Sequence, residues 1–412
     1  MLGRSAAFVV AATVGAATLS AASAPSPLYP VYQRLFGFSS LVLTVVFAVY
    51  VVALLVALLT VGSVSDIVGR RPVASAALVL LAVGMMLFAG AEGTGTLLVA
   101  RIVQGFAVGA ATGTITAMIL DAAPGPVIGS VVSSAFSPLG IAIGAVLSGA
   151  LVEFAPLPRQ LVYWVLGAVY VVLAGLVWLV PEPGREGAER NVDGHEGTRP
   201  SVWRSLVPSA ALPVEVAPTF AALAPSISAT WALAGLYLSL GSSVIGDLLG
   251  VTSHFVIGLV LGVFFASGIA GTALSAALRP QLREPFGYGA LAAGVAVTMA
   301  ATASSSLPVY LVGSVLAGAG FGASFRFAVN ALGEKAPPES RGEVFATMYI
   351  VSYLAFSVPA LVAGLAVEAV GLEPTALGYG CLVIALVAGA SVASARIRRR
   401  GASDTTKKQE QA

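Results

Sequence analysis

The sequence predicts an all-α membrane protein with twelve transmembrane helices in two six-helix bundles related by a parallel pseudo-two-fold repeat. Three observations carry this prediction: 58% of the 412 residues are hydrophobic and 10% are charged, the apolar stretches have the length of membrane spans, and the two halves share residues at one constant spacing. A soluble protein carries roughly 25% charged residues. The composition therefore excludes a set of soluble domains and indicates a chain surrounded by lipid.

Apolar stretches of about 20 residues, long enough to cross a bilayer, recur between charges, glycines and prolines. The first stretch follows Arg4 and ends near Ala22-Ser23-Ala24, so it also resembles a secretory signal with its cleavage site. The segment from Pro25 to Pro30 continues as a short loop toward the next helix, and the internal repeat requires the first stretch, so we interpret it as a span. The twelve expected helices are 6–26, 41–62, 72–92, 96–120, 128–153, 161–180, 217–240, 254–278, 286–304, 308–332, 341–366 and 374–396.

The distribution of Lys and Arg predicts the orientation in the membrane. With the N-terminus inside, 17 of the 21 Lys and Arg residues lie in cytoplasmic segments, Arg34 and Arg159 lie outside, and Arg101 and Arg326 lie within spans. By the positive-inside rule, both termini are cytoplasmic in a multi-pass cell-membrane protein. The net charge of +2 is scattered rather than gathered on a basic face, which argues against a nucleic-acid partner.

A long polar stretch between the sixth and seventh spans divides the chain. It is rich in charge, Gly and Pro and has no apolar periodicity, which is typical of a flexible linker. The basic cluster after the last span most simply anchors that helix at an anionic leaflet, and a partner-binding tail is the alternative. The expected organisation is an N-terminal bundle (1–181), a cytoplasmic linker (182–215), a C-terminal bundle (216–396) and a solvated cytoplasmic tail (397–412).

The two halves superpose without a gap at one constant offset, the one that carries Gly37 onto Gly250. Because six spans is an even number, both copies have the same topology, and a parallel repeat places a binding site between the halves near mid-membrane. The identical pairs are Gly37 and Gly250, Ser40 and Ser253, Met86 and Met299, Gly105 and Gly318, Gly109 and Gly322, Pro124 and Pro337, and Gly129 and Gly342.

The loop between the second and third spans carries a recognisable pattern, Gly62-Ser-Val-Ser-Asp66-Ile67-Val-Gly69-Arg70-Arg71-Pro. It resembles the loop signature of the major facilitator superfamily, and the span count, linker and repeat extend the resemblance to essentially the whole chain. Ile67 stands where the family usually has a basic residue, which implies a weaker latch. An alternative is that the two arginines are only positive-inside anchors.

The resemblance implies that this loop is a cytoplasmic gate. The acid would face the N-terminus of the eleventh span at Ser340–Glu343, where the helix dipole favours negative charge, and the first arginine would pair with an acid at the end of the fourth span. Both contacts would keep the cytoplasmic side closed in the outward-open state. The implied gate residues are Gly62, Asp66, Gly69, Arg70, Arg71 and Asp121.

The fourth span contains Arg101 and Gln104 in a stretch that resembles the family's second signature, Arg-x-x-Gln-Gly. Residues three apart share a helix face, and an arginine in hydrocarbon is costly unless it faces the bundle interior or water. Because Arg101 is near the outer end of its span, snorkelling to the interface is an alternative. In family members that exchange protons, this arginine is thought to influence the proton site. The antiporter signature expected in the fifth span is degenerate around Gly140–Gly149, which weakens the inference of antiport.

Arg326 lies about 12 Å of helix rise from the cytoplasmic end of its span, too deep for easy snorkelling. Asn330 follows one turn later on the same face. We expect both to line the central cavity, with Arg326 binding an anionic or hydrogen-bonding group of the substrate. A structural pair with an acid elsewhere is the alternative.

Aromatic residues on the expected cavity helices suggest a site for a bulky apolar or amphipathic solute. Three of them, in the eleventh span, are spaced to share one helix face. Ordinary helix packing explains such a stripe equally well. The candidate cavity aromatics are Tyr50, Phe136, Trp231, Tyr349, Tyr353 and Phe356.

Proton coupling lacks an obvious carrier, because we find no Asp or Glu near the middle of a span, where proton-coupled transporters usually place one. A relay through Asp247 and His254 at the outer mouth is conceivable, although a solvated loop pair is the simpler interpretation.

The sequence predicts no enzyme, no cofactor and no metal site, because no nucleophile–base or ligand constellation and no Walker-type loop is visible. The prediction is a monomeric secondary transporter in the lipid bilayer whose partners are a small-molecule substrate and protons. The leading interpretation is multidrug-type antiport, with efflux of a lipophilic or amphipathic compound. The alternative is uptake or facilitated transport of a small anionic metabolite, which the two intramembrane arginines would serve.

Overall fold

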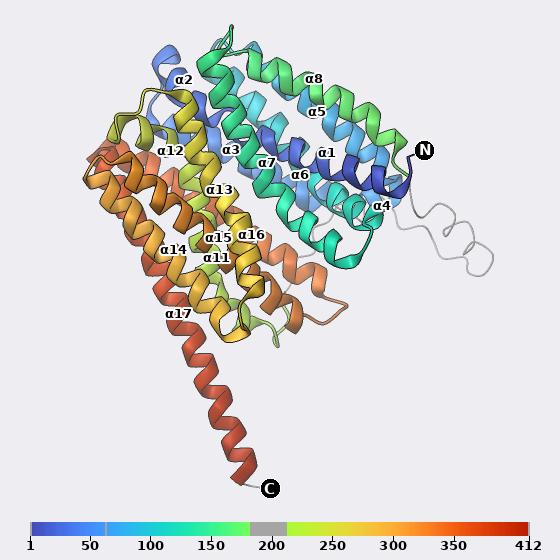
Figure 1. Cartoon of the computed structure of the whole chain (residues 1–412), viewed down its shortest axis with the longest axis vertical. Helices are drawn as coiled ribbons and strands as arrows, with labels where there is room; N and C mark the ends of the chain where they lie inside the picture. The colour runs from blue at the N-terminus through green and yellow to red at the C-terminus, as the bar shows by residue number, and fades with distance from the viewer. Residues whose placement is uncertain (1, 62–63, 182–211, 411–412) are drawn as a thin grey trace, which may run out of the picture.

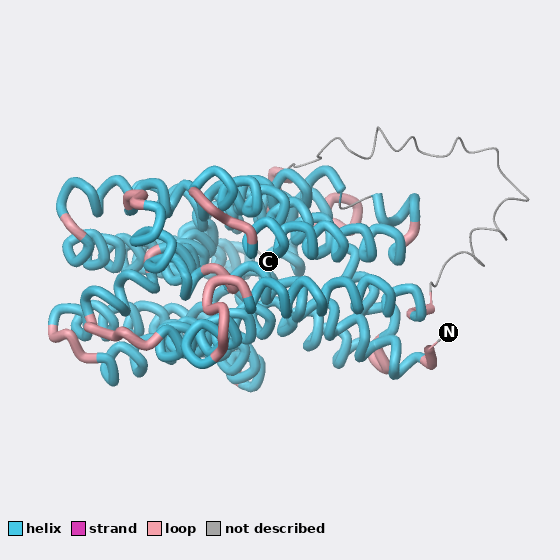
Figure 2. Tube along the Cα trace, turned by 90° about the horizontal axis from the view of Figure 1, so that it is seen from above, coloured by secondary structure: helices cyan, strands magenta, loops and turns pink. Residues whose placement is uncertain are grey.

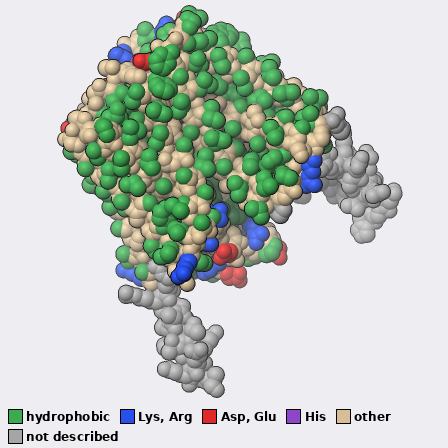
Figure 3. All heavy atoms as spheres, viewed as in Figure 1, with side chains coloured by type: hydrophobic (Ala, Val, Ile, Leu, Met, Phe, Trp, Pro, Cys, Tyr) green, Lys and Arg blue, Asp and Glu red, His purple; other side chains and the backbone are tan. Residues whose placement is uncertain are grey.

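The computed structural model describes residues 2–61, 64–181 and 212–410, and within these ranges every regular element is a helix. Twelve of the helical segments are long and apolar enough to cross a membrane, which confirms the predicted spans. Large apolar side chains such as Val127, Phe154 and Val172 are more than half exposed, and hydrophobic atoms cover much of the surface in Figure 3. This is the surface expected of a protein whose solvent is lipid.

The first bundle contains α1 to η2 and the second contains α11 to α17 (Figure 1). The first is made of α1 (Arg4–Ser23), η1 (Ser26–Leu28), α2 (Tyr29–Phe36), α3 (Ser40–Val61), α4 (Val64–Val68), α5 (Arg70–Ala89), α6 (Thr94–Ala122), α7 (Pro126–Phe154), α8 (Leu161–Leu176) and η2 (Val177–Leu179). The second is made of α11 (Ala217–Ser239), α12 (Gly241–Ser243), η3 (Val244–Leu248), α13 (His254–Ala277), α14 (Pro280–Ala303), α15 (Leu307–Lys335), α16 (Arg341–Val370) and α17 (Leu372–Glu410).

Helical structure extends beyond the expected bounds at several places, including after Leu240 and before Phe286, and two of them change the expected organisation. The segment expected to be a loop after Pro25 instead forms the short helix η1 and then α2, each with a proline in its first turn, where the missing N–H costs nothing. The tail after Arg396, expected to be solvated like the linker, continues α17 to Glu410 and projects from the body in Figure 1. No proline interrupts this stretch, so the helix can propagate. The expected linker lies largely outside the described residues.

The two bundles repeat the same packing. In the first, α6 packs against α1, α3 and α5, α1 packs against α7, and α5 packs against α8. In the second, α15 packs against α11, α13 and α14, α11 packs against α16, and α14 packs against α17. Figure 2 shows the resulting helices in two layers. This correspondence confirms the two six-helix bundles expected from the internal repeat.

Three of the four glycine pairs of the repeat have the same role in each bundle, Gly129 and Gly342 being the exception. Gly37 and Gly250 both end a helical segment in a left-handed conformation, with φ of 66° and 67°, which only glycine adopts at little cost. Gly105 on α6 abuts the carbonyl of Tyr50 on α3, and Gly318 on α15 abuts the carbonyl of Phe264 on α13. A β-carbon at either position would collide with backbone.

The bundles meet along two seams, α3 against α16 and α7 against α13. We call the end of the molecule at which α1 begins and α8 leads toward the linker the linker end, and the opposite end, with α2 and α12, the distal end (Figure 1). The bundles touch at the distal end, where Ser26 donates to the carbonyl of Leu238 at 2.9 Å and Ser242 donates to the carbonyl of Ser26 at 2.6 Å. The distal end is therefore closed.

Candidate transport site

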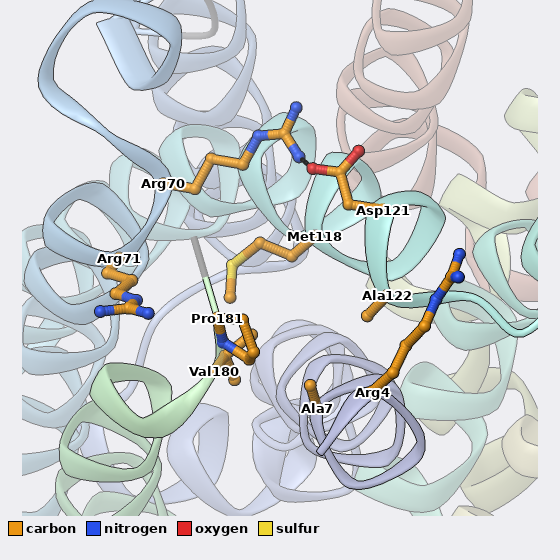
Figure 4. Close-up of a pocket in the computed structure, with 9 residues that line it drawn as sticks. All are labelled: Arg4, Ala7, Arg70, Arg71, Met118, Asp121, Ala122, Val180 and Pro181. Carbon is orange, nitrogen blue, oxygen red and sulfur yellow. Dashed lines mark ion pairs between the residues drawn. The ribbon is translucent and has the colours of Figure 1, made fainter. Parts of the chain in front are cut away.

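The loop at the linker end is built as a sharp turn between two helices. Gly69 separates α4 from α5 with φ of 107°, a conformation that L side chains rarely adopt, so Arg70 begins a new helix there. The guanidinium of Arg70 forms an ion pair with Asp121 at the end of α6, and both side chains are partly exposed. Figure 4 shows the pair. Gly62 and the side chain of Asp66 lie outside the described part of the chain.

Beside this ion pair is a cavity of about 270 Å³ within the first bundle. Its floor is apolar, formed by residues such as Met118 and Val180, and Arg4 and Arg71 flank it from opposite sides in Figure 4. The Arg70–Asp121 pair joins two helices of one bundle, α5 and α6. It therefore fixes the internal geometry of the first bundle at the linker end.

Arg101 lies in the interior of the first bundle. Its side chain is 0% exposed, so snorkelling does not occur in this structure. The guanidinium donates to Gln104 Oε1 at 2.7 Å, to the carbonyl of Ala22 at 3.3 Å and to the hydroxyl of Tyr29. It also lies 5.2 Å from the ring centroid of Tyr50, within the range of cation–π attraction.

The end of α1 explains why backbone carbonyls are available to this polar pair. Pro25 stands four residues after Ala21 and has no N–H to donate, so the Ala21 carbonyl loses its usual helical partner. The side-chain amide of Gln104 donates to that carbonyl instead. A buried carbonyl without a partner is costly, and the Arg101–Gln104 pair satisfies the frayed end of α1.

The hydrogen bonds of Arg101 do not neutralise its positive charge. Among the described residues no carboxylate lies within ion-pair reach of its guanidinium, and its buried Nε has no hydrogen-bond partner. A charged side chain at membrane depth costs roughly 3 kcal/mol or more unless polar groups compensate. Arg101 is therefore a cation held by neutral groups, namely aromatic rings, the hydroxyl of Tyr29, the amide of Gln104 and the carbonyl of Ala22.

The central aromatics form a cluster that joins both bundles. Trp231 on α11 packs against Tyr353 and Phe356 on α16, with ring centroids 5.1 Å and 5.6 Å apart. Phe356 in turn lies 4.9 Å from Phe47 on α3 of the first bundle. Tyr349 stacks on Tyr353 at 6.3 Å. The cluster therefore spans the boundary at which the two bundles must move.

Two of the predicted cavity aromatics lie in the first bundle rather than in this cluster. Tyr50 is buried and faces Arg101, and Phe136 is buried beside Gly15 of α1, whose absent side chain leaves room for the ring. Within the cluster, Trp231 has a buried indole N–H that lacks a hydrogen-bond acceptor among the described residues. An unpartnered donor of this kind is costly and is free to bind a solute acceptor.

Arg326 and Asn330 lie on one face of α15, away from the aromatic cluster. Arg326 is partly buried and forms no hydrogen bond or ion pair with any described residue, and Asn330 is exposed. Arg326 follows Ala319 by seven residues, so Arg326 and Ala319 share one face of α15. Ala319 abuts Gly271 of α13, so this face is the one directed toward α13. Their lining of the central cavity stays a prediction.

Two acidic features were not assigned a role from the sequence. Glu284 near the start of α14 is 7% exposed and lines a cavity of about 410 Å³ with Tyr288. The sequence held one signal for Glu284. The offset that carries Gly37 onto Gly250 places Glu284 at the position equivalent to Arg71 of the gate loop. The second feature is a pair of carboxylates at the distal seams, Glu153 and Glu368, described below.

Asp247 and His254 line a distal cavity of about 490 Å³ between the bundles, together with Arg34. Burial raises the pKa of Asp247 above its usual value, and the charge of Arg34 offsets part of that rise. Asp247 therefore binds its proton more tightly in this partly open cavity than it would in bulk water.

Comparisons with known proteins show which folds this architecture resembles. A comparison with curated protein sequences gives no match. The fold is similar to that of a bacterial homologue of the human lysosomal transporter Spinster in an inward-facing, unoccupied conformation, with a TM-score of 0.72, 14% identity, and coverage of 95% of this chain and 97% of that one. It is also similar to the inward-open xylose transporter XylE from E. coli, with a TM-score of 0.70, 18% identity, and coverage of 93% and 95%.

A third similar fold is that of the human organic anion transporter MFSD10, with a TM-score of 0.60, 17% identity, and coverage of 95% of this chain and 100% of that one. At these identities the likeness concerns the fold. The family model described as Major Facilitator Superfamily matches residues 10–358. The chain therefore belongs to the Major Facilitator Superfamily and is a membrane transporter that moves a small solute by alternating access rather than an enzyme.

Proposed function

We propose that this transporter exports a lipophilic or amphipathic compound from the cytoplasm in exchange for protons, as a monomer in the cell membrane. The linker end faces the cytoplasm in this proposal, because it carries most of the Lys and Arg residues. With the distal end closed by contacts between the bundles, the solute would enter from the cytoplasmic side, as export requires.

The aromatic cluster is the observation that supports the proposed substrate class. Trp231, Tyr353 and Phe356 offer uncharged ring faces at the boundary between the bundles. Apolar pockets with a few placed polar groups suit drug-like solutes. The unpartnered indole N–H of Trp231 would give one directional contact.

The gate and the domains complete the proposal. The 1–181 and 216–396 bundles would rock about the two seams while the 182–215 linker joins them. The Arg70–Asp121 pair would hold the linker-end loop in shape, so that Asp66 can meet the start of α16 at Arg341 when the cytoplasmic side closes. The helix dipole at that N-terminus would stabilise the carboxylate.

A second candidate is transport of a small anionic metabolite. Arg101 supports it, because this buried cation has no carboxylate partner among the described residues, and an anionic solute would neutralise it. Arg326, also without a partner there, would add a second positive charge on the path.

Transport in everted membrane vesicles separates the two candidates. We expect panels of lipophilic compounds to dissipate an imposed pH gradient in vesicles that contain the protein, and expect the substitution Trp231→Ala to remove the response. Trp164→Ala is the matched control, because Trp164 lies on α8 and is 51% exposed. A response to anionic metabolites alone, abolished by Arg101→Met and kept by Trp231→Ala, would replace export by the second candidate. Solute movement without any pH change would overturn proton exchange.

A further inference from the structure

At one seam, a carboxylate of the first bundle caps a helix of the second. Glu153 stands at the end of α7, and its Oε2 accepts a hydrogen bond of 2.9 Å from the backbone N–H of His254, the first residue of α13. The imidazole Nδ1 of His254 lies 3.7 Å from the same oxygen. The first N–H groups of a helix have no partner within the helix, and the helix dipole favours a negative charge there.

The other seam has the same arrangement with the bundles exchanged. Glu368 stands near the end of α16, and its Oε1 accepts a hydrogen bond of 3.1 Å from the backbone N–H of Leu41, the second residue of α3. The offset that carries Gly37 onto Gly250 also carries Leu41 onto His254, so the two capped positions are equivalent in the internal repeat. In each bundle, therefore, one carboxylate caps the start of a helix of the other bundle.

A short sequence element places each carboxylate. Gly149-Ala-Leu-Val-Glu153 ends α7, and Gly364-Leu-Ala-Val-Glu368 ends α16. Each glycine packs directly on the opposing helix, Gly149 on the carbonyl of His254 and Gly364 on the side chain of Thr44. Because a residue four positions later lies one turn further on the same face, each glutamate reaches the start of the helix that its glycine touches.

We infer that the two Gly-x-x-Val-Glu elements form a paired latch that stabilises the distal-closed state, and that breaking both caps is part of distal opening. The bundles must part at both seams for the distal end to open, so neither cap survives in the open state. A charge-assisted cap at a partly exposed helix start favours the capped state by about 2- to 5-fold. Because the seams lie apart, the two caps multiply to about 4- to 25-fold.

The test removes the charges and measures the conformational equilibrium. Cys381 is the single cysteine, so a Cys381→Ser chain can carry spin labels at Glu92 and Ser305, which lie in distal loops of opposite bundles. We expect E153Q and E368Q each to increase the ratio of long to short distances by about 2- to 5-fold, and the double variant to multiply the effects. Glu373→Gln is the matched control, because Glu373 is an exposed distal carboxylate at the start of α17.

Gln is isosteric with Glu, and elution of the double variant at the position of the parent in size-exclusion chromatography shows that it is folded. An unchanged distance distribution in a folded double variant overturns the latch. A shift of the same size in Glu373→Gln also overturns it, because the effect would then be one of general surface charge. The measurement needs no substrate, so its outcome is independent of the solute and direction proposed above.

Discussion

Gly258 lies where α13 crosses α7 at the distal seam, and we predict that Gly258→Ala opens the distal end. A β-carbon at Gly258 would lie closer to the carbonyl oxygen of Ala145 than real β-carbons approach and 3.2 Å from the Cα of Gly149. Because both obstacles are backbone, no side chain can rotate away. The two helices would have to separate by about 1 Å to restore ordinary van der Waals distance.

The magnitude follows from the fact that the clash exists only in the closed state. Overpacking by one methyl group costs about 1–3 kcal/mol, and in the open state the seam is parted and the methyl group is free. The ratio of open to closed molecules should therefore rise by about 5- to 150-fold. The assay is the same distance measurement between spin labels at Glu92 and Ser305, supplemented by the reactivity of a cysteine placed in the distal cavity.

Gly175→Ala on α8 is the control for this prediction. Nothing lies within 4 Å of a β-carbon at Gly175, yet the substitution gives the same gain in helix propensity, up to about 1 kcal/mol. We expect it to leave the equilibrium unchanged. If Gly258→Ala leaves the distance distribution as it is in the parent, the α7–α13 seam does not set the closed state, and the reasoning from glycine contacts fails.

Three further predictions concern single side chains. Arg101→Met removes a buried charge that costs roughly 3 kcal/mol but leaves the carbonyl of Ala22 and the hydroxyl of Tyr29 without their donor, at about 1–3 kcal/mol each, so we expect an equal or lower melting temperature in detergent together with loss of transport. Trp231→Phe keeps the aromatic packing and removes the indole N–H, so transport of solutes with a hydrogen-bond acceptor should fall by roughly 5-fold or more while that of purely apolar solutes is kept. The pKa of Asp247 is raised by its partial burial at the distal cavity, with the charge of Arg34 lowering it in part. We expect the distal-closed state, in which this cavity is formed, to bind the proton more tightly, so that lowering the pH from about 6 to about 4 favours the closed state. Asp247→Asn should remove that pH dependence.

Each of these has a result that would contradict it. Wild-type transport by Arg101→Met would show that the buried cation serves the solute path in no way. An equal loss of all solutes in Trp231→Phe would place the defect in packing rather than in a hydrogen bond. A pH response of the distance distribution that persists in Asp247→Asn would assign the titration to another group.

The spans and the repeat were predictable because they depend on local composition and spacing. An apolar stretch of about twenty residues between charges is a span whatever it packs against, and the paired glycines Gly105 and Gly318 reveal a repeat because backbone contact tolerates no other residue. The paired carboxylates were not predictable in this way. The register that aligns the glycines carries Glu153 onto Ala366 and not onto Glu368, so it does not reveal the pair. Their role depends on which opposing helix begins beside each, and that is a property of the assembled bundles.

The orientation of the Arg101 side chain likewise depends on tertiary structure rather than on local sequence. Its place seven residues after Thr94, at the start of α6, is compatible with a side chain that turns outward to the interface or inward to the bundle. The choice is made by α1, where Pro25 deprives the carbonyl of Ala21 of its donor and the helix presents acceptors to Arg101 and Gln104. Turning the guanidinium outward would leave the carbonyl of Ala22 and the hydroxyl of Tyr29 buried without their donor, at about 1–3 kcal/mol each. The inward orientation is thus set by a proline on another helix, and among the described residues the bundle surrounds the cation with neutral groups and no acid.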